Sequence, residues 1–277
     1  MGFYLVNRII HLSVSRGLSI REETQLKNLS IDEKSFKKGH QYITVLSNPD
    51  TGIIIDLGDG RTKKATKALI NEVLTEKQKQ QVETVSMDMW KAYMNVVKEE
   101  LPNSKICHDK FHLVKYLNDA VDKVRRRETR KQEELRSTRY IWLKDHMNLT
   151  EKQRIKFDSI DLTNYKTAKA WRIKENFRAI HFKQSQAEAF ILFYKWLQNA
   201  LNSGMGQIIK VAKMFDTHMM GIINAMVYSK SNAMAERLNG KIQEIKLSAR
   251  GYRKFENFRS AILFFHGGLK LYPQESL

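Results

Sequence analysis

Cysteine is almost absent from this chain of 277 residues, in which Cys107 is the single example. A lone thiol excludes a disulfide framework and a zinc ribbon, and it is typical of a reducing compartment. Long apolar runs are also missing: residues 189–194 form one of the longest, whereas a membrane-spanning helix needs about 20 apolar residues. The N-terminus has neither a basic leader nor a small-residue cleavage site, so no signal peptide is predicted. We therefore expect a cytoplasmic protein without a membrane partner.

Acidic residues are scarce relative to basic ones, with 30 Asp and Glu against 48 Lys and Arg, which gives a net charge of +18. Such an excess favours a polyanionic partner, and nucleic acid is the commonest. The alternative is a protein that is merely soluble and basic. Since 42% of the residues are hydrophobic, the chain can bury a core in one large domain or in two.

Short apolar, β-branched runs separated by turn signals predict a sheet in the first part of the chain. The first three follow each other closely, as in an antiparallel meander, and a helix over 62–80 comes next. A β-α-β unit follows, in which Asp88 ends the first strand and Trp90 begins the apolar stripe of the helix. Open α/β sheets bind ligands at such strand ends. The predicted strands cover residues 29–34, 42–47, 53–57, 82–87 and 105–107.

From Phe111 to about Tyr228 the pattern is helical throughout. The first of these helices continues into a basic run over 123–131, which is either a solvated face or a phosphate-contacting one. Thr150 and Gln153 form a capping box. Three tryptophans of this block are predicted to be core residues rather than base-stacking platforms, namely Trp142, Trp171 and Trp196.

A late helix beginning near Ala233 carries a third notable acid, Glu236. Its predicted buried stripe consists of Leu238, Ile242 and Ile245, whereas Glu236 and Asn239 fall on a different face. Basic residues surround this segment at Lys241, Lys246, Arg250, Arg253, Lys254 and Arg259.

The order of these elements, β-β-β-α-β-α-β followed by a late helix, is that of an RNase H-like fold, a mixed α/β sheet. In that fold the first and fourth strands are neighbours and a C-terminal helix packs over their ends. Asp32, Asp88 and Glu236 would therefore converge. Clustered carboxylates repel one another unless a cation is present, and hard oxygen ligands suit Mg²⁺ or Mn²⁺. Two such ions can activate a nucleophilic oxygen and stabilise the leaving oxygen of a phosphodiester.

Several motifs in this order resemble the DDE transposases of the ISL-three group of bacterial insertion sequences. They are IDEKSFKKGHQYITVL (31–46), VSMDMWKAY (85–93), CHDKFHLVKYLNDAVDKVRRRE (107–128), SNAMAERLNGKIQEIK (231–246) and ARGYRKFENFR (249–259). The resemblance implies that Asp32, Asp88 and Glu236 are the catalytic acids, which also bind two divalent ions, Mg²⁺ or Mn²⁺. It implies cleavage and strand transfer of DNA at element ends and into target DNA, in the nucleoid. A homo-oligomer on paired ends is expected by analogy.

The expected organisation has four parts. Residues 1–24 are interpreted as the remnant of an upstream DNA-binding helix, and 25–120 as the first part of the catalytic core. Residues 121–227 are interpreted as a large all-α insertion between the second and third acids, and 228–277 as the C-terminal helical part of the core. Members of the group carry an upstream zinc segment and helix-turn-helix modules, and this chain starts at the tail of that region. We therefore expect impaired sequence-specific transposition.

Further residues are predicted around the acids. Asp109, His112 and Asn239 are expected at the edge of the active site, and Asp56 is interpreted as a turn residue. His108 and His112 stand at i and i+4, which would suit a metal on a helix, but no third ligand is evident. Residues expected to contact DNA are Lys123, Arg125, Arg126, Arg127, Arg130, Lys241, Lys246, Arg250 and Arg253.

Two other function classes stay open at this point. The first is a non-catalytic DNA-binding remnant that interferes with full-length transposase, for which binding would need no metal and would survive Asp88→Asn. The second is a metal-dependent nuclease of the same fold that nicks DNA without joining it.

Overall fold

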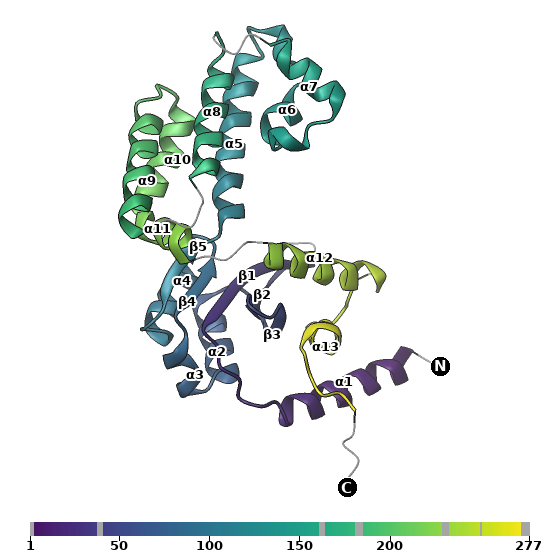
Figure 1. Cartoon of the computed structure of the whole chain (residues 1–277). Coiled ribbons are helices and arrows are strands. Elements are labelled where there is room, and N and C mark those ends of the chain that lie inside the picture. Colours follow the sequence, from purple (N-terminus) through teal and green to yellow (C-terminus); the bar gives the residue numbers. More distant parts are fainter. Residues whose placement is uncertain are drawn as a thin grey trace. The chain divides into compact units, whose positions relative to one another are not determined.

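The structure is a computed structural model, and it describes residues 3–37, 41–160, 164–180, 185–228, 233–249 and 251–272. Residue contacts divide the chain into two compact units. The first combines Met1–Cys107 with Lys230–Leu277, and the second is His108–Ser229. Figure 1 shows both, and each is described by itself.

A five-stranded sheet with the order β3-β2-β1-β4-β5 forms the centre of the first unit. β1 pairs antiparallel with β2 and parallel with β4, and β2 pairs antiparallel with β3. The predicted strands and the predicted contact between the first and the fourth are confirmed. The strands are β1 (Asn28–Lys37), β2 (Gln41–Asn48), β3 (Ile53–Asp59), β4 (Thr84–Met87) and β5 (Lys105–His108).

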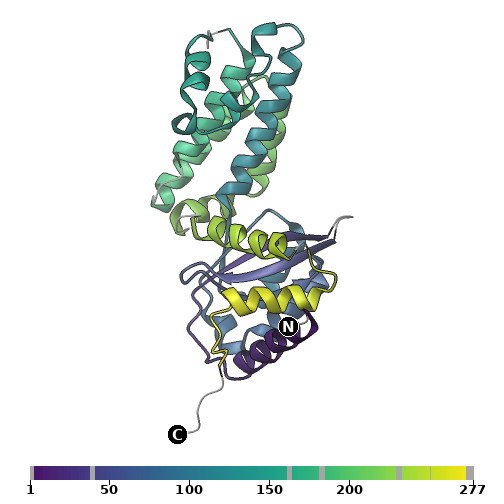
Figure 2. The same cartoon turned by 90° about the vertical axis from the view of Figure 1, so that its right-hand side faces the viewer.

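Helices cover both faces of this sheet, because successive side chains of a strand point to opposite sides and both sides are apolar. One hydrophobic cluster joins Ile31 and Met87 to helices α2 and α4, and the other joins Val45 to α12 and α13. Figures 1 and 2 show the same separation, with α2, α3 and α4 on one side and α12 and α13 on the other. The helices are α1 (Phe3–Ser19), α2 (Lys63–Val73), α3 (Glu76–Gln81), α4 (Lys91–Glu100), α12 (Ala233–Ser248) and α13 (Phe255–His266).

Two details of this unit differ from the sequence-based expectation. The helix predicted over 62–80 is divided, because Thr75 starts α3 with a capping box to Gln78. Residues 3–19 belong to this unit rather than standing apart, since α1 packs along α13. His11 of α1 contacts Asn257 (2.9 Å) and Ser260 (3.0 Å) of α13, and Val14 is buried in the shared core.

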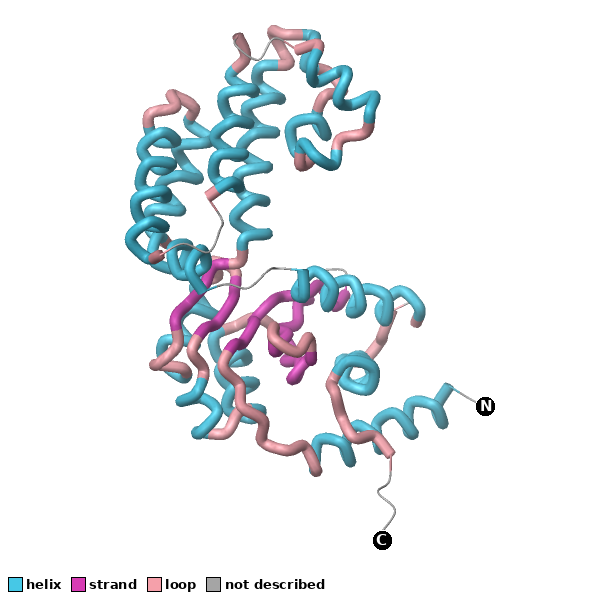
Figure 3. The backbone as a smooth tube through the Cα atoms, viewed as in Figure 1, coloured by secondary structure: helices cyan, strands magenta, loops and turns pink. Residues whose placement is uncertain are grey.

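The described part of the second unit consists of helices and loops after the end of β5 (Figure 3). Its boundary lies at His108 rather than at residue 121, because α5 runs unbroken from Lys110 to Glu128. The capping box of Thr150 and Gln153 is present. Trp142 and Trp196 are buried as predicted, and the half-buried Trp171 ring lies 6.4 Å from that of Trp142.

The helices of this unit are α5 (Lys110–Glu128), α6 (Arg139–Leu143), α7 (Glu151–Asp158), α8 (Lys166–Ala179), α9 (Gln186–Leu201), α10 (Gly206–Thr217) and α11 (Met219–Tyr228), with short 3₁₀ turns at Glu133–Leu135 and His146–Asn148. Among the described residues, no helix combines the length and the apolar character that crossing a bilayer would require.

Candidate active site

Asp32 and Asp88 follow directly on the last paired residues of two neighbouring strands. The parallel register of β1 and β4 ends at Ile31 opposite Met87, so the two acids are the next residues on each strand. Adjacent strands lie about 4.8 Å apart, which brings two carboxylates separated by 56 positions in the sequence to one edge of the sheet. The prediction that these acids meet therefore has a structural basis in strand pairing.

Both carboxylates are held in the same way. The backbone N–H of Glu33 donates to Asp32 Oδ1 (2.8 Å), and that of Met89 donates to Asp88 Oδ1 (2.7 Å). On the other side of Asp32, Lys34 Nζ lies 2.7 Å from Oδ2. Since Lys34 is two residues further along β1, its side chain shares the face of Asp32 and keeps a positive charge beside that acid.

The third predicted acid is carried by the helix that covers this face. Asp32 pairs with Val45, whose side chain lies in one cluster with Leu238, Ile242 and Ile245 of α12. The predicted apolar stripe of α12 is therefore confirmed. The backbone of Glu236 lies in the first turn of α12, and its side chain lies outside the described residues.

Glu33 faces the opposite side of β1, as expected from strand alternation, and holds Arg61. Arg61 Nη1 donates to both carboxylate oxygens of Glu33 (2.8 and 3.1 Å). This hydrogen bond is the main reason why the pKa of Arg61 is raised. The sequence analysis did not single out Arg61; its position just past the end of β3 was the available signal.

Tyr93 packs against the same side of β1 as Glu33. Its hydroxyl lies 3.0 Å from Thr44 Oγ1, and its ring is buried. Burial raises the pKa of Tyr93 well above its usual range, and the negative charges of Glu33 and Asp32 raise it further. Tyr93 therefore stays a neutral phenol that supports this end of the sheet.

The residues present fit a hard divalent cation. Asp32 and Asp88 supply carboxylate oxygens from adjacent strands, which are the ligand type that such ions take, and Lys34 Nζ lies 2.7 Å from Asp32 Oδ2. Within the described residues there is no group of three or more His, Cys, Asp or Glu side chains able to hold a metal. The described residues do not include the side chain of Glu236.

The residues predicted at the edge of the site lie on two different units. Asn239 is half-buried on α12 of the first unit. Asp109 caps α5 by accepting from the N–H of Phe111 (2.8 Å), and His112 lies in the first turn of that helix, in the second unit. His108 ends β5, so the two histidines do not share a helix as the i and i+4 spacing suggested. The edge role of Asp109, His112 and Asn239 stays a prediction.

Most of the basic residues predicted to contact DNA are accessible. On α5, Lys123, Arg126 and Arg127 are exposed, as is Arg130 just beyond it. Arg125 differs, because its guanidinium is buried and binds Asp122 through Nε (3.0 Å) and Nη2 (2.8 Å). A phosphate cannot reach a guanidinium held in this way, so Arg125 has a structural role.

In the first unit, Arg253 is exposed and Lys241 is half-buried. Lys246 connects α12 to β1 by donating to the carbonyl of Ser35 (2.5 Å). Arg250 lies outside the described residues. The DNA contacts of these residues stay predictions.

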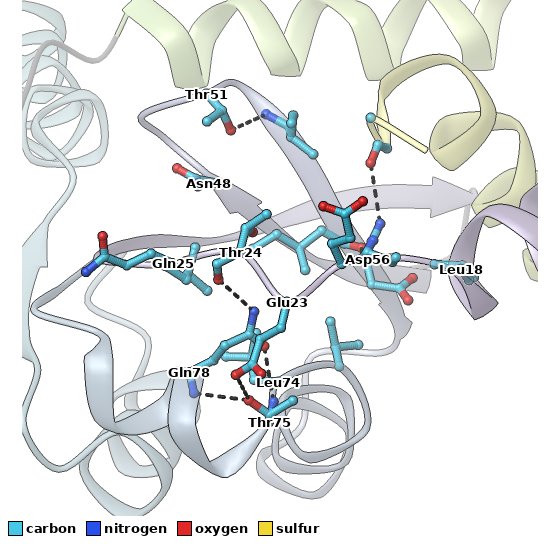
Figure 4. Close-up of a pocket in the computed structure, with 18 of the residues that line it drawn as sticks. Leu18, Glu23, Thr24, Gln25, Asn48, Thr51, Asp56, Leu74, Thr75 and Gln78 are labelled. Atoms are coloured by element: carbon cyan, nitrogen blue, oxygen red, sulfur yellow. Dashed lines mark hydrogen bonds between the residues drawn. The ribbon is translucent and has the colours of Figure 1, made fainter. Parts of the chain in front are cut away.

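A pocket lies toward the opposite end of the sheet, under the segment that joins α1 to β1 (Figure 4). The Thr75 hydroxyl donates to Glu23 (2.7 Å), and Gln78 donates to the carbonyl of Thr24 (3.1 Å). Asp56 accepts two hydrogen bonds from Arg259 (2.6 and 2.5 Å). The interpretation of Asp56 as a turn residue is wrong: it is a buried member of β3 that needs this arginine.

Comparison with known proteins shows the family of this chain. The chain is 27% identical over 250 residues to the transposase for insertion sequence element IS1001 of Bordetella parapertussis, which covers 87% of this chain and 61% of that protein. It is 26% identical over 256 residues to the transposase for IS1557 of Mycobacterium tuberculosis (strain H37Rv), covering 82% and 57%. The chain thus spans about six tenths of the length of these relatives. The family model of the ISL3-type DDE transposases, described as "Transposase", matches residues 29–262, and the chain belongs to this family.

Proposed function

We propose that this chain carries the catalytic region of an insertion-sequence transposase, which cleaves DNA strands and joins them to target DNA. The observation that carries the proposal is the register of β1 and β4, which places Asp32 and Asp88 at one edge of the sheet. We interpret the second unit as an all-α insertion between Asp88 and Glu236. The proposed substrates are element ends and target DNA in the nucleoid, and the proposed active form is a homo-oligomer on paired ends.

Each residue has a defined part in this proposal. Asp32 and Asp88, together with Glu236, would hold divalent cations, Mg²⁺ or Mn²⁺. Such ions, when bound, activate a nucleophilic oxygen and stabilise the leaving oxygen of a phosphodiester. The backbone N–H groups of Glu33 and Met89 orient the two carboxylates. Lys34 reduces the repulsion between these neighbouring acids.

The positive charge of the chain supplies the attraction for DNA that this function needs. The exposed residues Lys123, Arg126, Arg127 and Arg130 are proposed to contact phosphates from the second unit, and Lys241 and Arg253 from the first. Asp109, His112 and Asn239 are proposed to line the edge of the site.

Nicking and joining of plasmid DNA test the proposal. The full chain is incubated with supercoiled plasmid and labelled oligonucleotide duplexes in Mg²⁺, in Mn²⁺ and in EDTA. We expect metal-dependent nicks and joined products that Asp32→Asn, Asp88→Asn and Glu236→Gln each reduce to background. Glu244→Gln, which changes an exposed acid of the same helix, is the matched control and should leave both products unchanged.

The outcomes separate the alternatives. Nicks without joined products would favour a nuclease of this fold. DNA binding that Asp88→Asn leaves unchanged, combined with no metal-dependent nicking in any divalent ion, would favour a non-catalytic remnant. Thermal melting of each variant shows whether lost activity reflects lost folding.

A further inference from the structure

Trp90 is exposed just after the end of β4, although the sequence pattern places it in a buried stripe. It follows Asp88 by two residues and precedes the first residue of α4. The buried stripe of that helix consists of Tyr93, Val96 and Val97, whereas Trp90 keeps 42% of its surface exposed. Part of the indole is therefore covered by the protein, and the remainder is open to solvent.

The indole is nevertheless held firmly in place. Trp90 Nε1 donates to the carbonyl of Arg61 (3.2 Å). The guanidinium of Arg61 lies 4.9 Å from the Trp90 ring centroid and 4.0 Å from that of Tyr42. Glu33 fixes the same guanidinium with two hydrogen bonds, and Glu33 is the neighbour of Asp32. An aromatic–arginine–aromatic stack therefore connects β1, β2 and the loop after β4.

Two members of the stack, Arg61 and Tyr42, also line an open groove. Its other walls include the cations Lys37 and Lys254, the aromatic Phe255, and the acids Asp59 and Glu256. Immobilised aromatic rings next to a positively charged track are the arrangement that single-stranded nucleic acids recognise, because every base presents a π-face and every nucleotide a phosphate. Base stacking also needs no sequence readout.

We propose that Trp90, backed by Arg61 and Tyr42, binds an unpaired DNA base on the face of β1 that carries Glu33. This inference rests on the proposed function for the identity of the substrate. The base stacks on the exposed indole, and the adjoining phosphates follow Lys37 and Lys254. The site thus selects DNA whose strands are locally separated.

Binding in EDTA tests this site without any need for catalysis. The probes are fluorescein-labelled single-stranded (dT)15 and a 15-base-pair duplex, measured by anisotropy with the full chain. Trp90→Ala should weaken (dT)15 binding roughly five- to hundredfold, as expected for one lost stacking contact, and should leave duplex binding unchanged. Trp90→Phe should retain most of the affinity. Arg61→Lys keeps the charge but loses the planar stack, so it should give an intermediate loss.

A covalent readout locates the contact directly. We expect (dT)15 containing 5-iododeoxyuridine to crosslink on irradiation to the peptide that contains Trp90. Phe265→Ala removes another exposed aromatic of the first unit and is the matched control, which should change neither affinity nor crosslink. Thermal melting verifies that each variant is folded.

Three results would overturn the inference. They are equal loss of single-stranded and duplex binding in Trp90→Ala, no loss of either, or crosslinking to the exposed Phe190 and Tyr194 of α9 instead. Since nicking of plasmid is measured separately, an active enzyme with unchanged (dT)15 binding in Trp90→Ala would refute the base site alone. Normal base binding without metal-dependent nicking would refute the catalytic proposal alone.

Discussion

Among the single residues of the second unit, Asp122 holds several arginines through one carboxylate. Its buried carboxylate contacts Arg125 (2.8 Å), Arg126 (2.7 Å) and Arg139 (3.5 Å). Arg125 also donates to the carbonyl of Leu135 (3.5 Å), which ties α5 to the following turn. Arg125 and Arg126 are neighbours in one basic run but differ in role, because Arg125 is buried and Arg126 is exposed.

Truncation of these two arginines should separate stability from DNA binding. Arg125→Ala leaves Asp122 without its buried partner, and we expect a loss of about 3 kcal/mol in the free energy of unfolding. Arg126→Ala removes an exposed partner and should cost less than about 1 kcal/mol. Urea unfolding followed by tryptophan fluorescence measures both, since Trp142, Trp171 and Trp196 lie in this unit. Under conditions where both variants are folded, Arg126→Ala should weaken DNA binding more than Arg125→Ala does.

Asp122 should also make stability depend on acidic pH. Burial raises the pKa of Asp122, but the hydrogen bonds and charges of Arg125 and Arg126 outweigh it, so the pKa lies below the usual value of 3.8. The unfolded chain then binds the proton more readily, and the stabilisation is present above about pH 4 and is lost as pH falls through the lowered folded value.

Asp122→Asn tests this dependence. The variant should be less stable than the parent at pH 7, and its unfolding free energy should fall less steeply between pH 4 and pH 2. Identical slopes for the two proteins would show that other carboxylates cause the acid sensitivity.

At the scale of elements, two helical glycines have opposite roles. Gly221 of α11 is buried, and a Cβ at this position would overlap the imidazole of His108. Gly240 of α12 is exposed, and a Cβ there would meet no atom within 4 Å. Close approach requires the first glycine, whereas nothing in the described surroundings requires the second.

Alanine at these positions should therefore change stability in opposite directions. Gly240→Ala should stabilise the chain by about 0.5–1 kcal/mol, because alanine loses less backbone entropy in a helix. Gly221→Ala should destabilise it by roughly 1–3 kcal/mol through overpacking against His108. Thermal melting and urea unfolding measure both, and a stabilising Gly221→Ala would contradict the packing described for α11.

At the scale of the whole molecule, charge is the dominant property. The net charge of +18 is distributed over both units, and the described cations of the α5 run mostly face solvent. Binding to DNA should therefore weaken steeply with salt, because each neutralised phosphate releases counterions.

The salt dependence tests the proposed α5 surface. Glutamine at Lys123, Arg126, Arg127 and Arg130 together should lower the slope of log K against log salt by roughly 3 to 4, at about 0.9 per phosphate contact. The slope comes from anisotropy titrations of a duplex at several salt concentrations.

The matched control removes equal charge elsewhere in the same unit. Glutamine at Lys152, Arg154, Lys156 and Lys195, which are all exposed, should change the slope much less. Equal changes in the two variants would mean that net charge, rather than a surface on α5, determines binding.

The local sequence pattern was sufficient to predict the strands and helices, but it was insufficient to predict the burial of several side chains. The five strands and the buried stripe of α12 were predictable because alternation and helical periodicity are properties of neighbouring residues. Trp90 fits the periodicity of α4 but lies before its first residue, so the pattern misplaced it. Asp56 resembles a turn residue in sequence, and only its distant partner Arg259 explains its burial within β3.

By itself, the sequence determined the class of the protein, through its positive charge, the order of its strands and helices, and its match to the family. The tertiary structure decided which residues meet. Pairing of β1 with β4 brings Asp32 beside Asp88, and a turn after β3 carries Arg61 to Trp90. The physical reason is that hydrophobic periodicity indicates only which side of a single helix or strand is buried. Contacts between residues far apart in the chain depend instead on strand register and packing, which no local window contains.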